Sequence, residues 1–377
     1  MAVVLAAAAL IGCVYQIAAA ILTVRYMRTH EPTPSARPGI SVLKPLHGDE
    51  PGLADNLRAL CRLDYPAFQI LCNTLDPIDP AWRVAEQVRA EFPAVAMQNA
   101  AGEGSAARNR KIASLENLLP RATHDILAFA DADVGAAPLY LDNIAAALEK
   151  PGAGLVTCLY LAQPTGTLWS QLESQWINLA FLPSVLVARA IGRRDGCFGA
   201  TIALHRATLD RVGGLAPLRD LLADDFALGA AVRELGLTIE LAARPVDMVV
   251  HHNGFMAMFT HEVRWGRTIA VLDRFGYAAS ILTQPVILGL AAALLGGLAW
   301  PFVATFLGAG VVRYLAVRAQ ERALGVTPAP APLLALREVL TFAVFVAALW
   351  GRTVHWRGSR YRIHRDGTMQ SVEESPS

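Results

Sequence analysis

The stretch DILAFADAD at residues 125–133 decides the fold class of this chain. Five apolar residues follow Asp125, so we expect a buried strand over 125–130 that leads into the pair Asp131 and Asp133. Two carboxylates separated by one residue on a turn can converge on one hard cation, and that cation can hold a diphosphate. Aspartate is also common in turns that bind nothing, so the pair alone leaves both interpretations open.

Short apolar runs alternate with helical patterns on both sides of this strand. We expect further strands at 40–46, 69–75 and 154–160, and helices at 52–63, 80–91 and 139–148. Such alternation predicts an α/β fold in which helices cover a mainly parallel sheet. Ligands of these sheets bind beyond the carboxyl ends of the strands, where Asp76 and Asp131 both fall.

The composition excludes several classes of protein. Apolar residues make up 54% of the 377 residues and charged residues 17%, and the mean hydropathy is +0.37. This content argues against a disordered chain and against a disulfide scaffold. A formal net charge of +1 gives no general attraction to polyanions, so we expect no nucleic-acid partner. The five cysteines include no CxxC pair, which favours reduced thiols, and neither GxGxxG nor a P-loop motif is present.

The apolar residues are concentrated near the two ends of the chain. We interpret residues 1–25 as an uncleaved transmembrane anchor, because 2–24 carries no charge and can span a hydrocarbon core of ~30 Å. Arg25, Arg28 and Arg37 follow it, which predicts that the chain after the anchor lies in the cytoplasm.

The second apolar region covers 276–350. It predicts two spans with a turn near 297–301, and then a stretch at 333–350 that either spans the membrane or lies in its interface. The basic tail at 351–377 predicts a cytoplasmic C-terminus. Together these features predict a multi-pass protein of the inner, cytoplasmic membrane.

Residues 40–275 have the composition and length of one α/β domain that faces the cytoplasm. Within it, 166–191 predicts an amphipathic helix that lies on the membrane or lines a lipid entrance, with a buried core helix as the alternative. Asp79 precedes Pro80 and is expected to cap the helix that begins there. This leaves Asp76 free to accept the imide N–H of a uracil.

Two charged groups flank the strand at 125–130 in the sequence. Asn109, Arg110 and Lys111 follow the small-residue loop 102–107, and paired cations on such a loop suit a diphosphate, although a solvated basic turn is the alternative. Asp224 and Asp225 open a helix, where carboxylates favour the helix dipole. The functional alternative is that they provide a general base at the carboxyl edge of the sheet.

The segment HEVRW at 261–265 places His261 and Arg264 on one face of a helix, with Trp265 one turn from His261. A Trp/Arg belt at the membrane surface is the alternative. His251 and His252 are not expected to form a metal site, because adjacent residues on a strand point to opposite faces.

The order of these motifs resembles that of the ceramide glucosyltransferase family, glycosyltransferase family 21. The resemblance covers about 235 residues plus the flanking apolar segments, and it includes ISVLKPLHGDEPGL, LDPIDPA, NRKIASLENLLP, DILAFADADV, GLVTCLY, CFGATIALHRATLDRVGGL, LADDFALG and HEVRW. The sequence is also similar to that of hopanoid-associated transferases, which add an N-acetylhexosamine to bacteriohopanetetrol. The family signature is three aspartates followed by (Q/R)xxRW. The matching residues are Asp76, Asp131, Asp225, Arg264 and Trp265, while His261 replaces the Gln or Arg.

The resemblance implies a glycosyltransferase A fold, a UDP-sugar donor, inversion at the anomeric carbon and a divalent metal. The metal, Mg²⁺ or Mn²⁺, is expected on Asp131 and Asp133, and Asp225 is expected to act as the catalytic base. The expected donor-binding residues are Asp76, Lys111, Asp131, His261, Arg264 and Trp265.

Transfer of glucose from UDP-glucose to ceramide is the expected activity, with transfer of N-acetylglucosamine to a hopanoid as the alternative. A processive polysaccharide synthase is disfavoured because too few spans are expected. A membrane scaffold with an inactive transferase domain is disfavoured because all three aspartates and the Arg-Trp pair are present.

Overall fold

The computed structural model of the chain describes residues 1–102, 107–351, 353–356, 359–363 and 368–371. The chain falls into two compact units. The first combines Met1–Thr29, Pro164–Ile191 and the residues from His252 onward, and the second combines His30–Gln163 and Gly192–His251. The sequence suggested one domain over 40–275, whereas in this division Pro164–Ile191 and the residues after His251 group with the N-terminal helix.

The second unit is built on a seven-stranded sheet, counted over the described residues. The strands in their spatial order are β3 (Met97–Ala101), β2 (Phe68–Thr74), β1 (Ile40–Leu46), β4 (Ile126–Ala130), β8 (Thr201–His205), β6 (Ala153–Thr157) and β9 (Thr238–Leu241). β1 pairs parallel with β2 and β4, whereas β8 runs antiparallel to β4 and β6. A small sheet follows the order β5 (Val134–Gly135), β10 (Val246–Val250) and β7 (Tyr160–Pro164).

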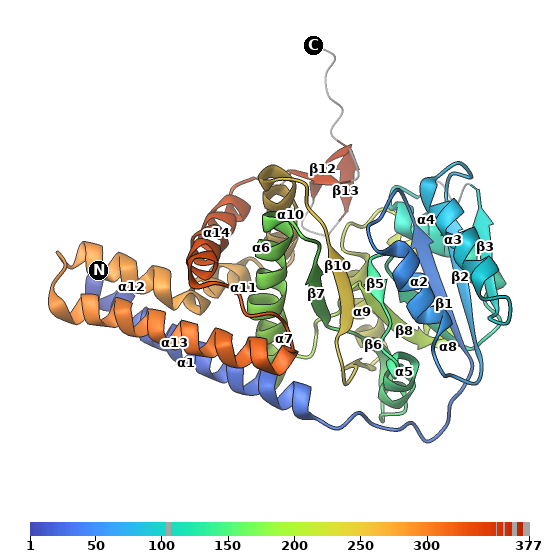
Figure 1. The fold of residues 1–377 in the computed structure, drawn as a ribbon, viewed down its shortest axis with the longest axis horizontal. Helices are drawn as coiled ribbons and strands as arrows, with labels where there is room; N and C mark the ends of the chain where they lie inside the picture. The colour runs from blue at the N-terminus through green and yellow to red at the C-terminus, as the bar shows by residue number, and fades with distance from the viewer. Residues whose placement is uncertain (103–106, 352, 357–358, 364–367, 372–377) are drawn as a thin grey trace, which may run out of the picture. The chain divides into compact units, whose positions relative to one another are not determined.

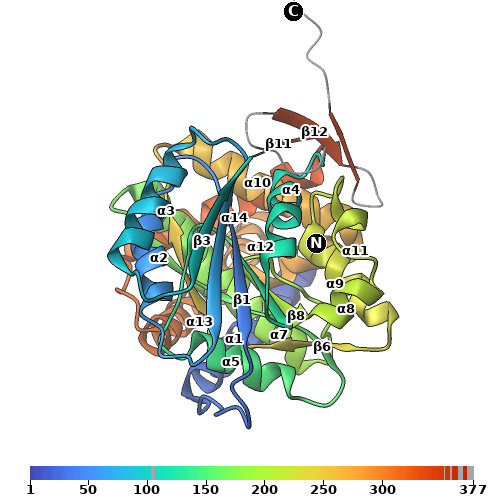
Figure 2. The same cartoon turned by 90° about the vertical axis from the view of Figure 1, so that its right-hand side faces the viewer.

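Helices cover both faces of the large sheet (Figure 2). One face carries α2 (Leu53–Cys61) and α3 (Pro80–Glu91), and the other carries α4 (Arg110–Leu118), α8 (Arg206–Arg211) and α9 (Asp224–Glu234). Short helices η1 (Leu119–Arg121) and η3 (Ala216–Leu218) and the helix α5 (Tyr140–Leu148) complete the unit. The buried core beneath α4, α8 and α9 includes Leu43, Leu127, Ile112, Leu209 and Val232.

The strand order reverses at β1, because the chain moves from β1 outward to β3 and then returns to β4 on the other side of β1. Helices after β1 and β2 lie on one face and the helix before β4 lies on the other. In sheets with this reversal, ligands bind beyond the carboxyl ends of the strands that flank it. A ligand site is therefore expected at the ends of β1 and β4.

Most predicted elements of this unit are confirmed. The strand at 40–46 and the helix at 80–91 have the predicted bounds, and the strands at 69–75 and 125–130 are shifted by one residue at most. The prediction of one strand at 154–160 is wrong, because β6 ends at Thr157 and β7 begins at Tyr160 in the other sheet. Between them the Cys158 N–H still bonds to Thr201 of β8 (3.1 Å), whereas the Leu159 carbonyl accepts from Val246 of β10 (2.8 Å).

The first unit is helical (Figure 1). Its elements are α1 (Ala2–Arg28), α6 (Leu168–Trp176), the π-helix η2 (Ile177–Phe181), α7 (Leu182–Ala190), α10 (Phe255–Leu272), α11 (Arg274–Ala279), η4 (Ser280–Thr283), α12 (Pro285–Leu295), α13 (Trp300–Leu324) and α14 (Ala331–Leu349). α1, α12 and α13 pack side by side, and α14 packs on α10 and α6. Strands β11 (Thr353–Trp356), β12 (Ser359–Ile363) and β13 (Met369–Ser371) follow α14.

Among the described residues, three helices are long and apolar enough to cross a membrane, namely α1, α13 and α14. Arg274–Thr283 and Pro285–Leu295 are also long and apolar enough to cross a membrane when they are counted as one span, with a bend of 73° between them. The chain turns between α12 and α13, where we expected a turn. The segment 166–191 forms α6, η2 and α7, and its buried residues include Leu172, Ile177 and Leu182.

Parts of two predicted segments lie outside the described residues. These are 103–106 of the loop at 102–107, and 352, 357–358, 364–367 and 372–377 of the basic tail.

Candidate functional site

Asp131 lies directly after β4, at the carboxyl ends of the parallel strands, where the sequence predicts a ligand site. Its backbone N–H donates to the Ala200 carbonyl (3.0 Å), which ties the end of β4 to the start of β8. Its carboxylate forms an ion pair with the Lys111 ammonium (2.7 Å), and the side chain keeps 37% of its surface exposed. A half-exposed carboxylate held by a lysine in this way is available to a ligand.

Lys44 stabilises the turn that Asp131 begins and Val134 ends. This lysine of β1 is completely buried, and its Nζ donates to the carbonyls of Asp131 (2.6 Å) and Val134 (2.9 Å). Burial lowers its pKa to about 8. Because Lys44 bonds to both ends of the Asp131–Val134 turn, it fixes the conformation that presents Asp131 and Asp133.

Lys111 lies in the first turn of α4, which Asn109 caps by accepting from the backbone N–H groups of Lys111 and Ile112. Besides Asp131, the Lys111 ammonium faces Asp224 (4.0 Å) and donates to the Gly199 carbonyl (3.0 Å). Burial lowers the pKa of Lys111, but the charges of Asp131 and Asp224 outweigh burial and raise it above its usual value. Lys111 therefore stays charged at neutral pH.

Asp225 lies beside this lysine, in the first turn of α9. Its Oδ1 accepts from the Phe226 N–H (2.8 Å). A Cβ on Gly199 would lie 3.2 Å from its Oδ2 and 3.5 Å from the Lys111 Nζ, so the bare α-carbon of Gly199 leaves room for both groups. Burial, together with the negative charge of Asp224, raises the pKa of Asp225 to about 7. A carboxyl that titrates near neutrality is suited to accept and release a proton.

Asp133 carries an unsatisfied buried oxygen. Its Oδ1 has no hydrogen-bond partner within the part of the chain that the structure describes. Burial, with the charges of Asp131 and Glu50, raises the pKa of Asp133 to about 7. An orphaned carboxylate oxygen next to Asp131 is the donor type that a hard divalent cation prefers.

Asp76 and Asp79 follow β2 and have different surroundings. Asp79 caps α3 by accepting from the Ala81 N–H (2.9 Å), and it also accepts from the Gly48 N–H (2.8 Å), so its predicted capping role is confirmed. Asp76 is exposed, and its Oδ1 accepts from the Ile78 N–H (3.0 Å). Its carboxylate is therefore accessible to a ligand.

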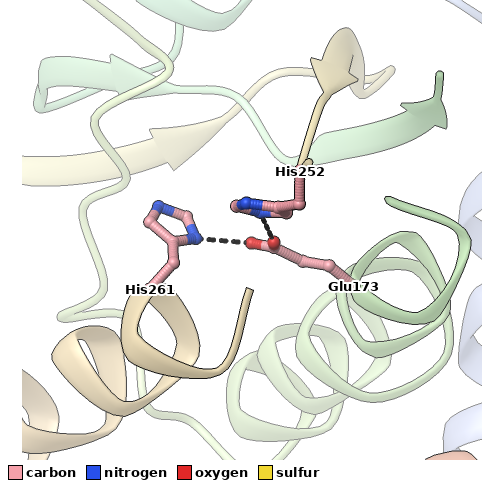
Figure 3. Close-up of side chains that lie close together, drawn as sticks. All are labelled: Glu173, His252 and His261. Atoms are coloured by element: carbon pink, nitrogen blue, oxygen red, sulfur yellow. Dashed lines mark hydrogen bonds and ion pairs between the residues drawn. The ribbon is translucent and has the colours of Figure 1, made fainter. Parts of the chain in front are cut away.

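The first unit contains the HEVRW segment, on α10. The His261 Nδ1 bonds to Oε1 of Glu173 (2.6 Å), and the other oxygen of Glu173 forms an ion pair with the Nε2 of His252 (Figure 3). Burial opposes the charge on Glu173, but the two histidines outweigh it and lower its pKa to about 2. The Trp265 ring lies 5.0 Å from that of His261 and 5.6 Å from that of Trp176, measured between centroids.

The profile of the family described as "Glycosyl transferase family 21" matches residues 4–369. The chain belongs to glycosyltransferase family 21. Ceramide glucosyltransferase 1 of Caenorhabditis elegans is 20% identical over 357 residues, which is 92% of this chain and 76% of that protein.

One solved structure agrees on the fold of this family 21 glycosyltransferase, and a second is reported beside it. The mannosyltransferase PcManGT of Pyrobaculum calidifontis, solved with GDP-Man and Mn²⁺, is 19% identical with a TM-score of 0.50, over 92% of this chain and 99% of that one. S. aureus TarS 1–349 with UDP-GlcNAc is 13% identical with a TM-score of 0.39, over 89% and 99%. The likeness to PcManGT confirms the predicted glycosyltransferase A fold. Membership of family 21 makes this protein a sugar-transferring enzyme.

Three residues that the sequence predicts for the site of this family 21 enzyme lie together in the structure, namely Lys111, Asp131 and Asp225. Sequence reasoning overlooked Lys44, whose only signal is a lysine inside an apolar strand. It also overlooked Glu173 and set His252 aside. His252 meets a histidine of the following helix and a glutamate of α6, which contains no other charged residue.

Proposed function

We propose that this enzyme transfers a sugar, with inversion, from a UDP-sugar to the primary hydroxyl of a membrane lipid, and that the pair is UDP-glucose and ceramide. The observation that carries the proposal is the cluster of Lys111, Asp131 and Asp225 at the sheet edge, which combines an anion-binding cation with a carboxyl that titrates near neutrality. The ceramide glucosyltransferase of C. elegans supports the lipid acceptor. Apolar helices suit an enzyme whose acceptor stays in the bilayer.

Two carboxylates fit a divalent cation, Mg²⁺ or Mn²⁺. Asp131 is half exposed, and Asp133 has a buried oxygen without a hydrogen-bond partner among the described residues. PcManGT was solved with Mn²⁺, which supports a metal of this kind. When bound, the cation offsets the negative charge that grows on the leaving diphosphate.

The remaining roles follow from the residues of the second unit. Asp225 accepts the proton of the lipid hydroxyl, whose oxygen attacks the anomeric carbon on the face opposite UDP. Lys111 donates to the diphosphate. Asp76 accepts the imide N–H of uracil through its exposed carboxylate.

Three roles are proposed from the family motif alone. Arg264 and His261 donate to the diphosphate, and Trp265 shapes the site. The Nδ1 of His261 faces Glu173, so its Nε2 is the atom for this contact. We also place the second unit on the cytoplasmic side of the inner membrane, because Arg25 and Arg28 end α1.

A product assay tests the substrate proposal. Purified full-length protein in detergent is offered UDP-glucose or UDP-N-acetylglucosamine, each with ceramide or bacteriohopanetetrol, and the lipids are read by mass spectrometry. We expect glucosylceramide to be the main product. An N-acetylhexosaminyl hopanoid as the main product would replace this donor and acceptor while leaving the family chemistry intact.

Asp131→Asn is expected to weaken the metal-dependent part of donor binding. The amide keeps the shape of the carboxylate but loses its charge, so both the cation and Lys111 lose a partner. Isothermal titration of the UDP-sugar with and without Mn²⁺ measures the effect, with the exposed Asp210→Asn as the control. Full-rate turnover of Asp131→Asn without metal would remove Asp131 from the metal site.

A further inference from the structure

Glu173 lies buried between two histidines from different parts of the first unit (Figure 3). Its side chain is 1% exposed, and it is provided by α6, while His252 follows β10 and His261 lies on α10. His261 faces Oε1 of the carboxylate and His252 faces Oε2.

The backbones that carry the two histidines are held by contacts around them. Ser170 accepts from the His252 N–H (2.9 Å), and the Thr167 hydroxyl donates to the His252 carbonyl (2.9 Å), so the backbone of His252 is fixed to the start of α6. α10 is tied to α14 by a buried pair in which the Arg337 guanidinium meets both oxygens of Glu262 (2.6 and 2.9 Å). Fixed backbones on both histidines reduce the reorganisation that binding an ion requires.

We propose that Glu173, His252 and His261 form a binding site for a transition-metal cation, with Zn²⁺ as the expected ion. Two imidazole nitrogens and one carboxylate are a ligand set that zinc uses, with water in the fourth position. The three ligand atoms lie within 4.8 Å of one another, and this is the one such trio of His, Cys, Asp or Glu found among the described residues. Bonds of about 2 Å to zinc need ligand atoms roughly 3–4 Å apart, so small side-chain rotations suffice.

The chemistry separates this site from the one proposed for Mg²⁺ or Mn²⁺. Asp131 and Asp133 offer only hard oxygen ligands, whereas the trio offers two nitrogens, which favour zinc. The ion would join α6, the residue after β10 and α10, and thereby hold the helix that carries Arg264 and Trp265. It binds the Nδ1 of His261 and leaves Nε2 free to donate. The inference does not depend on the donor or acceptor of the reaction.

Metal analysis of the full-length protein tests the proposal. The protein is purified in detergent, its affinity tag is removed, and it is incubated with Zn²⁺ and dialysed. We expect about one zinc per chain by mass spectrometry of the elements. Glu173→Gln and His261→Gln are expected to lose this zinc. His251→Gln, which changes the histidine next to the trio, and Asp133→Asn, which changes the other site, are expected to keep it.

The wild-type protein provides a second test that needs no variant. A chelator should remove the zinc and lower the Tm, and Zn²⁺ but not Mg²⁺ should restore both. These results keep the proposal testable even if Glu173→Gln does not fold. A wild-type protein without stoichiometric zinc, equal zinc in wild type and Glu173→Gln, or a Tm that the chelator leaves unchanged would each overturn it.

Discussion

Replacing Asp225 with asparagine is expected to lower kcat by about 10²–10⁴-fold, the usual contribution of a positioned general base. The amide keeps the size of the side chain and can still accept from the Phe226 N–H, but it cannot take a proton from the acceptor hydroxyl. The affinity for the UDP-sugar should change little, because in our proposal Asp225 does not contact the donor. Release of UDP measures kcat, and titration calorimetry measures donor affinity.

The same residue predicts a pH dependence. Because the pKa of Asp225 is about 7, the charged base forms as the pH rises through 7, and kcat/KM of the wild type should rise over that range. Asp225→Asn should lose this limb of the profile. A fall in donor affinity that parallels the loss of turnover would contradict the base assignment.

Stability provides a control for this variant. A carboxyl whose pKa in the folded state is raised above the unfolded value of about 3.9 destabilises the fold progressively as the pH rises from about 4 to 7. Asp225→Asn removes that cost, so its Tm at pH 8 should equal or exceed that of the wild type. An inactive but equally stable variant separates lost chemistry from misfolding.

The elements predicted best are those whose signal is local. The strand at 40–46 is a continuous buried run, and the helix at 80–91 begins at a cap and a proline that the sequence displays. The prediction of one strand at 154–160 was wrong because both halves of this segment are apolar, so no local pattern marks the break between them. The change of sheet after Thr157 depends on hydrogen bonds to Thr201 and Val246, which lie far away in the sequence.

The candidate site also contains residues that the sequence predicts and residues that it does not. Asp131 follows from the rule that ligands gather at strand ends, and Asp225 from the resemblance to the family signature. The contact between Glu173 and His261 joins residues 88 positions apart, and no local pattern predicts it. Lys44 is similar, because its role depends on two carbonyls of a turn that lies beyond β4.

The buried ion pair of Glu262 and Arg337 is expected to contribute strongly to the stability of the fold. Both side chains are almost completely buried, and the guanidinium also donates to the Leu172 carbonyl (3.2 Å), so the pair connects α10, α14 and α6. Arg337→Met is expected to reduce the free energy of unfolding by about 3–5 kcal/mol, because it leaves the Glu262 carboxylate buried without its partner. Thermal and denaturant unfolding in detergent measure this loss.

A mutant cycle distinguishes an unpaired charge from lost packing. If the unpaired carboxylate causes the loss, Arg337→Met combined with Glu262→Gln should recover much of the stability, because the double variant buries no charge. Arg89→Met, which breaks an exposed pair with Glu86, is the control and should cost about 1 kcal/mol or less. Additive losses in the double variant would instead assign the effect to packing. In that case the pair contributes to the position of α10, and therefore of His261, through shape rather than through charge.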